Sequence, residues 1–186
     1  MRKVVVSEFV SVDGVMENPS WTFQFGSEEQ EKYKLDELLA SDALLLGRVT
    51  YEGFAGAWPS MTDEVGFADR MNGLPKYVVS TALEEPLGWN NSTIIKGDVA
   101  EEVSRLKQQP GGDILIGGSA DLVNTLMEHD LVDEYRLMVF PVVVGSGKRL
   151  FRGGGDRKAL RLVETKTFDS GVIVLTYRPA RTEAEG

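Results

Sequence analysis

The sequence predicts a single α/β domain whose sheet is mostly parallel, with an antiparallel edge near the C-terminus. Two short runs rich in apolar residues, Ala43–Leu46 and Asp113–Ile116, are each followed by a glycine and then a helical pattern. Such runs are typical of parallel strands that helices cover on both faces. From Leu131 onward, long strand-like segments joined by short turns favour antiparallel pairing. With 186 residues, one domain is the simplest organisation.

The first element is a strand from Lys3 to Val10, which is β-branched and bounded by the turn-like Ser11–Gly14. The loop that follows contains Trp21, Phe23 and Phe25 at alternate positions and has no Lys or Arg. These aromatic side chains suit either the apolar wall of a substrate site or an ordinary loop that covers the core. The sequence leaves both interpretations open.

A helix from about Glu28 to Ala40 is expected next, because Ser27 and Gln30 form a capping box and leucines then recur at helical spacing. A second capping box, Asp98 with Glu101, predicts another helix, which ends before residue 110. Short strands are expected around these helices, at residues 43–46, 76–81 and 92–95.

The last third of the chain predicts a strand at 113–116, a helix that includes Leu122–Met127, and strands at 134–144, 160–168 and 172–178. The apolar run Leu137–Val144 is longer than one half-buried strand needs. It predicts either a homodimer contact or a central strand buried on both faces. We expect the single domain to cover residues 1–178, and the polar tail 179–186 to be disordered.

The composition excludes several classes of function. A formal charge of −9 argues against a nucleic-acid partner, because backbone phosphates attract basic surfaces. The chain has no cysteine, so thiolate metal sites and cysteine nucleophiles are absent, and nothing points to another metal site. No apolar stretch reaches the roughly 18 residues that span a bilayer, and the N-terminus lacks the pattern of a signal peptide. We therefore expect a cytoplasmic protein with no membrane or nucleic-acid partner.

Two strand-to-helix junctions, Gly47–Tyr51 and Gly117–Ala120, are the strongest functional signals in the chain. Glycine lets the backbone approach a ligand closely, and the free N–H groups at a helix N-terminus favour an anion. Two such junctions in one sheet can hold the two ends of a dinucleotide. The alternative is that the glycines only make tight turns and Ser119 only caps a helix.

Several familiar catalytic motifs are missing. The chain contains no G-x-G-x-x-G, no phosphate-binding P-loop and no G-x-S-x-G elbow. Its single histidine, His129, is expected on the surface at a helix end, where it complements the helix dipole. A bound cofactor is therefore expected to supply the chemistry, with the protein adding binding, orientation and one acid.

Asp13 and Glu31 are the candidates for that acid. Asp13 precedes Gly14 at the mouth of the first strand, where a carboxylate either stabilises the turn or faces a ligand. Glu31 lies in the first full turn of the helix that leads to Gly47. Alternatively, Glu31 is only a solvated carboxylate on the surface of that helix.

Five segments, in this order, resemble the RibD C-terminal family, which consists of dihydrofolate-reductase-like reductases related to riboflavin biosynthesis. They cover nearly the whole chain and are Ser11–Gly14, Leu44–Phe54, Pro75–Ser80, Gly112–Ser119 and Pro141–Phe151. The resemblance implies a three-layer sandwich in which helices flank both faces of an eight-stranded, mainly parallel sheet.

The resemblance also implies a site for NADPH, with NADH less expected, across the two junctions. Carried over residue by residue, the cofactor phosphates would meet Gly47, Arg48, Val49 and Thr50, and the adenosine end Ser80 and Thr81. The pyrophosphate would meet Gly117, Gly118, Ser119 and Ala120. A preference for NADPH would rest on Arg48, Lys76 or Lys96, since no arginine lies beside Ser80 and Thr81.

The implied reaction is hydride transfer to a small heterocyclic or ribosylamino-pyrimidine substrate, as in the 5-amino-6-(5-phosphoribosylamino)uracil reductases. Ser11, Asp13 and Trp21 would lie near that substrate, and Phe23 and Phe25 would stack on its ring. Residues 4–31 contain no Lys or Arg to anchor a substrate phosphate, which argues against the riboflavin intermediate itself. Two alternatives stay open: a non-catalytic nucleotide-binding or assembly protein on the same fold, and a pteridine or dihydrofolate reductase.

Overall fold

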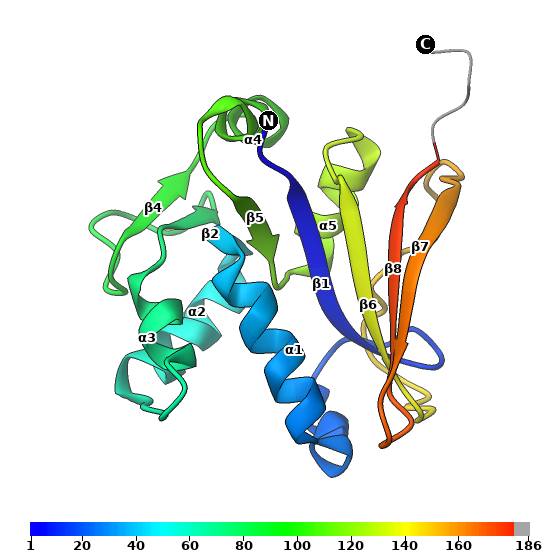
Figure 1. Cartoon of the computed structure of the whole chain (residues 1–186). Helices are drawn as coiled ribbons and strands as arrows, with labels where there is room; N and C mark the ends of the chain where they lie inside the picture. The colour runs from blue at the N-terminus through cyan, green and yellow to red at the C-terminus, as the bar shows by residue number, and fades with distance from the viewer. Residues whose placement is uncertain (181–186) are drawn as a thin grey trace.

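The computed structural model describes residues 1–180, which form one eight-stranded sheet with helices on both faces (Figure 1). The strand order across the sheet is β4-β3-β2-β5-β1-β6-β8-β7. The strands are β1 (Val4–Ser11), β2 (Ser41–Gly47), β3 (Lys76–Val79), β4 (Ser92–Ile95), β5 (Asp113–Ile116), β6 (Glu134–Phe140), β7 (Leu160–Thr167) and β8 (Ile173–Pro179). The α-helices are α1 (Glu28–Leu39), α2 (Arg48–Ala57), α3 (Phe67–Gly73), α4 (Val99–Gln108) and α5 (Ala120–Glu128). Short 3₁₀ helices span Pro19–Phe25 and Trp58–Ser60.

The sheet has the mixed pairing that the sequence predicts. All pairs among strands β1 to β6 are parallel, whereas β8 runs antiparallel to both β6 and β7. The turn between β7 and β8 includes Gly171, whose φ of 91° favours glycine. The expected antiparallel C-terminal edge is therefore confirmed.

Alternation along β1 divides the core between the two faces of the sheet. Val4, Val6 and Val10 pack with residues of α4 and α5, whereas Val5 packs with residues of α1, α2 and α3. In Figure 1, α1 lies in front of the sheet and α5 behind it. The three layers follow from this, because every central strand must bury both of its faces.

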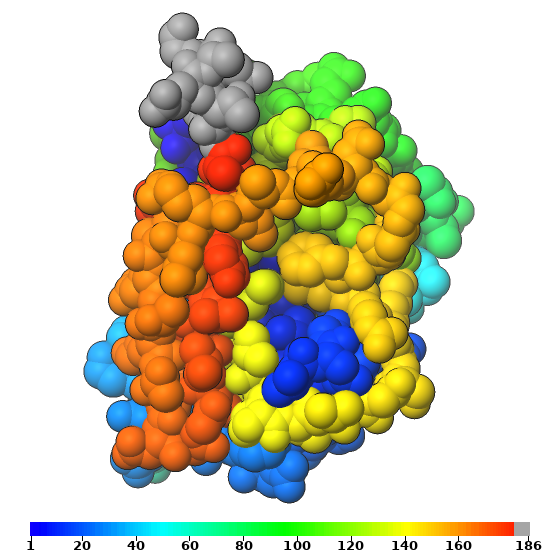
Figure 2. Space-filling model, turned by 90° about the vertical axis from the view of Figure 1, so that its right-hand side faces the viewer, coloured from blue at the N-terminus to red at the C-terminus, as the bar shows by residue number. Residues whose placement is uncertain are grey.

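A third apolar cluster joins the N-terminal loop to the C-terminal strands. Trp21 and Phe25 each pack on Phe140 at the end of β6, and their ring centroids lie 5.7 and 6.1 Å from the centroid of the Phe140 ring. In Figure 2, the segment after β6, yellow to amber, wraps around the blue loop that follows β1. An isolated antiparallel bridge between Val15 and Arg149 fixes this contact.

Both predicted capping boxes begin helices. Ser27 accepts a hydrogen bond from the Gln30 N–H at 3.2 Å, and Asp98 accepts one from the Glu101 N–H at 2.9 Å. Helix α3 has no counterpart among the predicted elements. The Asp63 carboxylate, which accepts N–H groups from residues 65 to 68, organises its start.

The predicted strand 134–144 ends earlier, at Phe140, because Pro141 follows and has no N–H for the ladder. β6 lies between β1 and β8, as a central strand would, and association into a homodimer stays a prediction. Ordered structure continues beyond residue 178: Pro179 ends β8, and the Ala180 N–H donates to the Ala159 carbonyl at 3.0 Å. The rest of the predicted disordered tail, 181–186, lies outside the described residues.

Within residues 1–180, no helix is long and apolar enough to cross a membrane.

Candidate active site

A cavity of about 980 Å³ opens where β1 loses one of its two neighbours. β1 pairs with β5 only from Val4 to Val6, but continues along β6 as far as Ser11. Beyond Val6, no strand among residues 1–180 pairs with the edge of β1 that faced β5. The carboxyl ends of β2 and β5 meet at the same opening, which is where ligands bind in open α/β sheets.

The first predicted junction forms one wall of this cavity. Gly47, Arg48, Val49 and Thr50 all line it, at the end of β2 and the start of α2. Among residues 1–180, no side chain caps the N-terminus of α2, and the first turn of this helix holds no acidic residue. The N–H groups of that turn are consequently available to an anionic ligand.

The second predicted junction lies against the first. The Gly47 N–H donates to the Gly118 carbonyl oxygen at 3.0 Å. A side chain at either glycine would overlap the other junction: a Cβ on Gly118 would lie 2.6 Å from the Thr50 Oγ1, and one on Gly47 would lie 3.0 Å from the Ser119 Cβ. Gly118 also has a φ of 129°, and its peptide bond to Ser119 is cis.

The roles of the second junction are mixed. Gly117, Ser119 and Ala120 line the cavity, whereas Gly118 supports the contact between the two junctions. Ser119 is also the N-cap of α5 and accepts the Leu122 N–H at 3.4 Å. The helix-capping role and the cavity position therefore coexist.

A smaller cavity of about 310 Å³ adjoins the first and shares Arg48, Val79 and Val99 with it. Ser80, Thr81 and Lys96 also line it. The Ser80 hydroxyl accepts the N–H groups of the next turn, at 3.1 Å each, and keeps its own proton to donate. Arg48 is half-exposed and bonds to Glu52 at 3.0 Å.

Lys76, the third cation that the sequence offers for a cofactor phosphate, is in neither cavity. Its side chain is completely buried, and the Nζ donates to the carbonyls of Asn72, Leu74 and Asn90 at 2.7 to 2.9 Å. It also lies 4.2 Å from the centre of the Trp89 ring. Burial lowers its pKa to about 8. Lys76 therefore organises the segment around α3 and does not serve a ligand.

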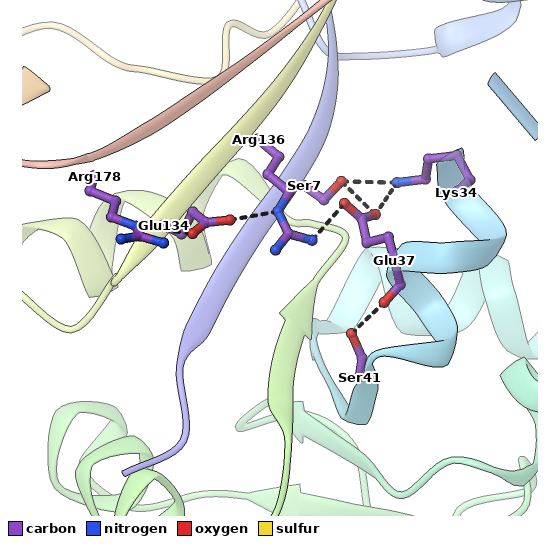
Figure 3. Close-up of polar contacts among 7 residues, drawn as sticks. All are labelled: Ser7, Lys34, Glu37, Ser41, Glu134, Arg136 and Arg178. Carbon is purple, nitrogen blue, oxygen red and sulfur yellow. Dashed lines mark hydrogen bonds and ion pairs between the residues drawn. The ribbon is translucent and has the colours of Figure 1, made fainter. Parts of the chain in front are cut away.

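A charge network borders the cavity beneath α1 (Figure 3). The buried Glu37 carboxylate accepts the Ser7 hydroxyl at 2.8 Å and the Lys34 Nζ at 2.6 Å, and its other oxygen accepts the Arg136 Nη1 at 3.3 Å. Burial alone would raise the pKa of Glu37, but Lys34, Ser7 and Arg136 together hold it below its usual value.

The network continues to the C-terminal edge of the sheet. Glu134 on β6 accepts the Arg136 Nε at 2.7 Å and the Arg178 Nε of β8 at 3.2 Å. Five charged side chains thus connect α1 to β6 and β8, as Figure 3 shows. This network fixes the position of α1 along one side of the cavity.

Glu8 is the most unusual side chain of the cavity lining. It follows the end of the β1–β5 pairing and is only 6% exposed. Its Oε1 is buried and has no hydrogen-bond partner among the described residues. Burial raises the pKa of Glu8 to about 8; Lys34 opposes this increase and Glu37 adds to it.

The two predicted acids lie elsewhere. Asp13 holds the loop after β6: its carboxylate accepts the Ser11 hydroxyl at 2.5 Å and the N–H groups of Val144 and Gly145 at 3.1 and 2.8 Å. These bonds, that of Ser11 first, lower the pKa of Asp13 to about 2. Glu31 is exposed on α1 and does not line the cavity. Its helix is oriented so that Lys34 and Glu37 face inward instead.

The predicted substrate residues are also outside the cavity lining. Ser11 accepts the Val15 N–H at 2.9 Å and belongs to the turn with Asp13. Trp21 and Phe25 pack on Phe140, and Phe23 is 82% exposed. The 3₁₀ helix separates these aromatic side chains, so they form a cover over the third apolar cluster and no continuous wall.

The cavity also contains residues that the sequence analysis missed: Ser7, Glu8, Lys34, Glu37 and Lys148. Glu8 was detectable as the one acid in a strand that is otherwise largely β-branched. Glu37 gave no such signal, because in the sequence it is one of several carboxylates of its helix. Residues 4–31 contain no Lys or Arg, but Lys34 and Lys148 bring positive charge to the cavity. Lys34 is paired with Glu37, and Lys148 with Asp121. His129 is exposed at the C-cap of α5, as predicted.

Comparison with known proteins decides the family. The model of the RibD C-terminal domain matches residues 2–174. The chain belongs to the RibD C-terminal domain family. Two uncharacterized Bacillus subtilis proteins are similar to it: YyaP, 32% identical over 95% of this chain and 94% of its own, and YwjB, 33% identical over 92% and 95%. The family resemblance stated from the sequence is confirmed.

Solved structures share the fold of this RibD C-terminal domain. A Shewanella sp. PV-4 protein, provisionally named a riboflavin biosynthesis protein, aligns with a TM-score of 0.80 at 19% identity, over 96% of this chain and 99% of its own. The Thermotoga maritima diaminohydroxyphosphoribosylaminopyrimidine deaminase/5-amino-6-(5-phosphoribosylamino)uracil reductase aligns with a TM-score of 0.67 at 15% identity, over 96% of this chain and 57% of its own. The predicted dihydrofolate-reductase-like fold is thus confirmed.

Proposed function

We propose that this RibD C-terminal domain is an NADPH-dependent reductase that transfers hydride to a small heterocyclic or ribosylamino-pyrimidine substrate. The observation that carries the proposal is the close contact of the two glycine junctions at one cavity, with the uncapped N-terminus of α2 open to an anion. The similarity of the fold to reductases supports the same reading.

The chain's own residues fit a dinucleotide. The absence of side chains at Gly47 and Gly118 lets the two junctions approach each other, and the α2 N–H groups suit a phosphate. The two adjoining cavities suit the two ends of an extended ligand, with Ser80, Thr81 and Lys96 at the adenosine end. The larger cavity, of about 980 Å³, is by itself at the upper end of the size range of ligand pockets. Reduced nicotinamide, when bound, supplies a hydride.

Arg48 is the residue on which the preference for NADPH depends. It lines both cavities, and its present partner Glu52 is half-exposed, so a phosphate can displace that partner at small cost. Charge-assisted hydrogen bonds to a phosphate are stronger than neutral ones. Arg48 is therefore expected to add affinity for NADPH beyond that for NADH.

The test is a titration of the protein with NADPH and with NADH, followed by nicotinamide fluorescence, for wild type and Arg48→Ala. Arg48→Ala should weaken NADPH binding by about 1 kcal/mol or more, which is about fivefold, and affect NADH less. The matched control is Arg105→Ala, an exposed arginine on α4 paired with Glu101 and Glu102, which should change neither affinity.

Two results would contradict the proposal. If neither nucleotide binds, the two junctions are only structural turns. If NADPH binds tightly but no substrate in a broad panel of pyrimidines and pteridines is reduced, a non-catalytic nucleotide-binding protein is the better description.

A further inference from the structure

Glu8 is a buried acid that no structural role explains. Nearly all buried polar atoms in proteins have a hydrogen-bond partner, because an unpaired one costs free energy. The Glu8 Oε1 has none among residues 1–180, although the side chain is only 6% exposed. An apolar residue at this position of β1 would avoid that cost. The carboxyl group therefore has the features of one that binds a ligand.

Its position is the second observation. Glu8 lies on the part of β1 that β5 no longer covers, and it lines the same cavity as both glycine junctions. The two acids that the sequence offered, the partly buried Asp13 and the exposed Glu31, do not line this cavity. Glu8 and Glu37 are the buried acids of the lining, and Glu37 is already engaged by Ser7, Lys34 and Arg136. Glu8 alone of the two keeps a free oxygen.

We propose that Glu8 is the proton donor of the reduction, holding a proton on its carboxyl group and passing it to the substrate atom that receives the electron pair. The inference rests on the proposed function. It also defines the substrate: an uncharged, conjugated C=N or C=O group whose nitrogen or oxygen accepts a hydrogen bond from a neutral carboxyl.

Proton transfer from Glu8 completes a balanced two-electron reduction of the substrate. The hydride comes with both electrons from a C–H bond of the reduced nicotinamide, which breaks and leaves the nicotinamide oxidised, and it forms a new C–H bond on the substrate carbon. The π electron pair of the C=N or C=O bond moves to the nitrogen or oxygen. The Glu8 O–H bond breaks, and its proton forms the new N–H or O–H bond. Glu8 is left as a carboxylate, which a proton from solvent neutralises before the next turnover.

The charges around the cavity suit both states of Glu8. Lys34 and Glu37 lie on α1, Glu17 and Lys148 come from the two loops beside β1, and Arg48 and Asp121 are at the starts of α2 and α5. The pKa of about 8 keeps Glu8 mostly protonated at neutral pH, since burial dominates and Glu37 assists it. The Lys34 ammonium stabilises the carboxylate that proton transfer leaves.

The experiment compares wild type with Glu8→Gln, which keeps the size and the neutral charge of a protonated glutamate but has no acidic proton. The control is Glu28→Gln, an exposed carboxylate at the start of α1. The unliganded proteins, labelled with ¹³C at the glutamate carboxyl, are titrated by NMR. One resonance, present in wild type and control but missing from Glu8→Gln, should titrate near pH 8.

The second measurement is single-turnover oxidation of NADPH, with 5-amino-6-(5-phosphoribosylamino)uracil and 7,8-dihydrofolate as probes. Glu8→Gln should lower the rate for a reduced probe by about 100-fold or more, with NADPH affinity unchanged. The wild-type rate should fall about tenfold per pH unit above pH 8, and the residual rate of Glu8→Gln should not. The Glu28→Gln protein should follow wild type throughout.

The failures of the two proposals are distinguishable. A Glu8 resonance that titrates near the ordinary value of 4.5 overturns the inference without any turnover. A Glu8→Gln protein that reduces the probe as fast as wild type overturns it too, and leaves the reductase assignment intact. If wild type binds no NADPH, or reduces neither these probes nor any other pyrimidine or pteridine of the panel, the proposed function falls and takes this inference with it.

Discussion

Replacing Glu37 by glutamine tests whether the charge network beneath α1 stabilises the fold. The Glu37 carboxylate is 2% exposed, whereas its partners Lys34 and Arg136 are 22% and 19% exposed. Removing one member of a buried ion pair costs about 3–5 kcal/mol, because a charge stays buried without compensation. Lys34 keeps its bond to Ser7 and Arg136 keeps Glu134, so we expect the lower end, about 3 kcal/mol.

The control variant is Asp36→Asn on the same helix. Asp36 and its partner Lys32 are 60% and 76% exposed, so this pair contributes at most about 0.5 kcal/mol. For a chain of this size, each kcal/mol shifts the melting temperature by roughly 2–4 °C. Glu37→Gln should therefore lower the melting temperature by roughly 6–12 °C, and Asp36→Asn by no more than about 2 °C.

The same pair of variants gives a pH test with a definite sign. The pKa of Glu37 is lower in the folded protein than in the unfolded chain. Its stabilisation is therefore fully present above the ordinary glutamate pKa, and is lost as the pH falls towards the folded value. The difference in unfolding free energy between wild type and Glu37→Gln, measured by urea denaturation, should shrink in acid. Equal stability of the two at neutral pH would refute the reasoning and show that desolvation of the network cancels its attraction.

Two further predictions concern the site. Gly47→Ala should destabilise the protein by about 1–3 kcal/mol in urea denaturation and abolish NADPH binding, because the added Cβ would press on Ser119. The control Gly56→Ala, in open space on α2, should be neutral or stabilising. Equal effects of the two substitutions would exclude the close contact between the junctions. Asp13→Asn should increase hydrogen exchange at the two loop N–H groups that donate to the Asp13 carboxylate, while leaving NADPH affinity unchanged. Because the pKa of Asp13 is about 2, the wild-type loop should stay protected down to strongly acidic pH. Loss of NADPH binding in Asp13→Asn would instead place Asp13 in the binding site.

The sequence by itself determined the local elements and one part of the site. Capping boxes at Ser27 and Asp98 located two helix starts, because a cap involves neighbours three residues apart. The two glycine junctions were recognisable for the same reason: a strand, a glycine and a helix are contiguous in the chain. The antiparallel edge followed from the short turn between β7 and β8.

Only the tertiary structure decided which acids face the cavity. The free edge of β1 beyond Val6 depends on how far β5 pairs with it, and these strands are more than 100 residues apart in the chain. The contact of Glu37 with Arg136 likewise joins residues separated by 99 positions. Local patterns carry no information on such register, so Glu31 and Glu37 looked alike as helix carboxylates. Burial then separates them: Glu37 is enclosed by other elements, which supply its partners Ser7 and Arg136, whereas Glu31 is exposed.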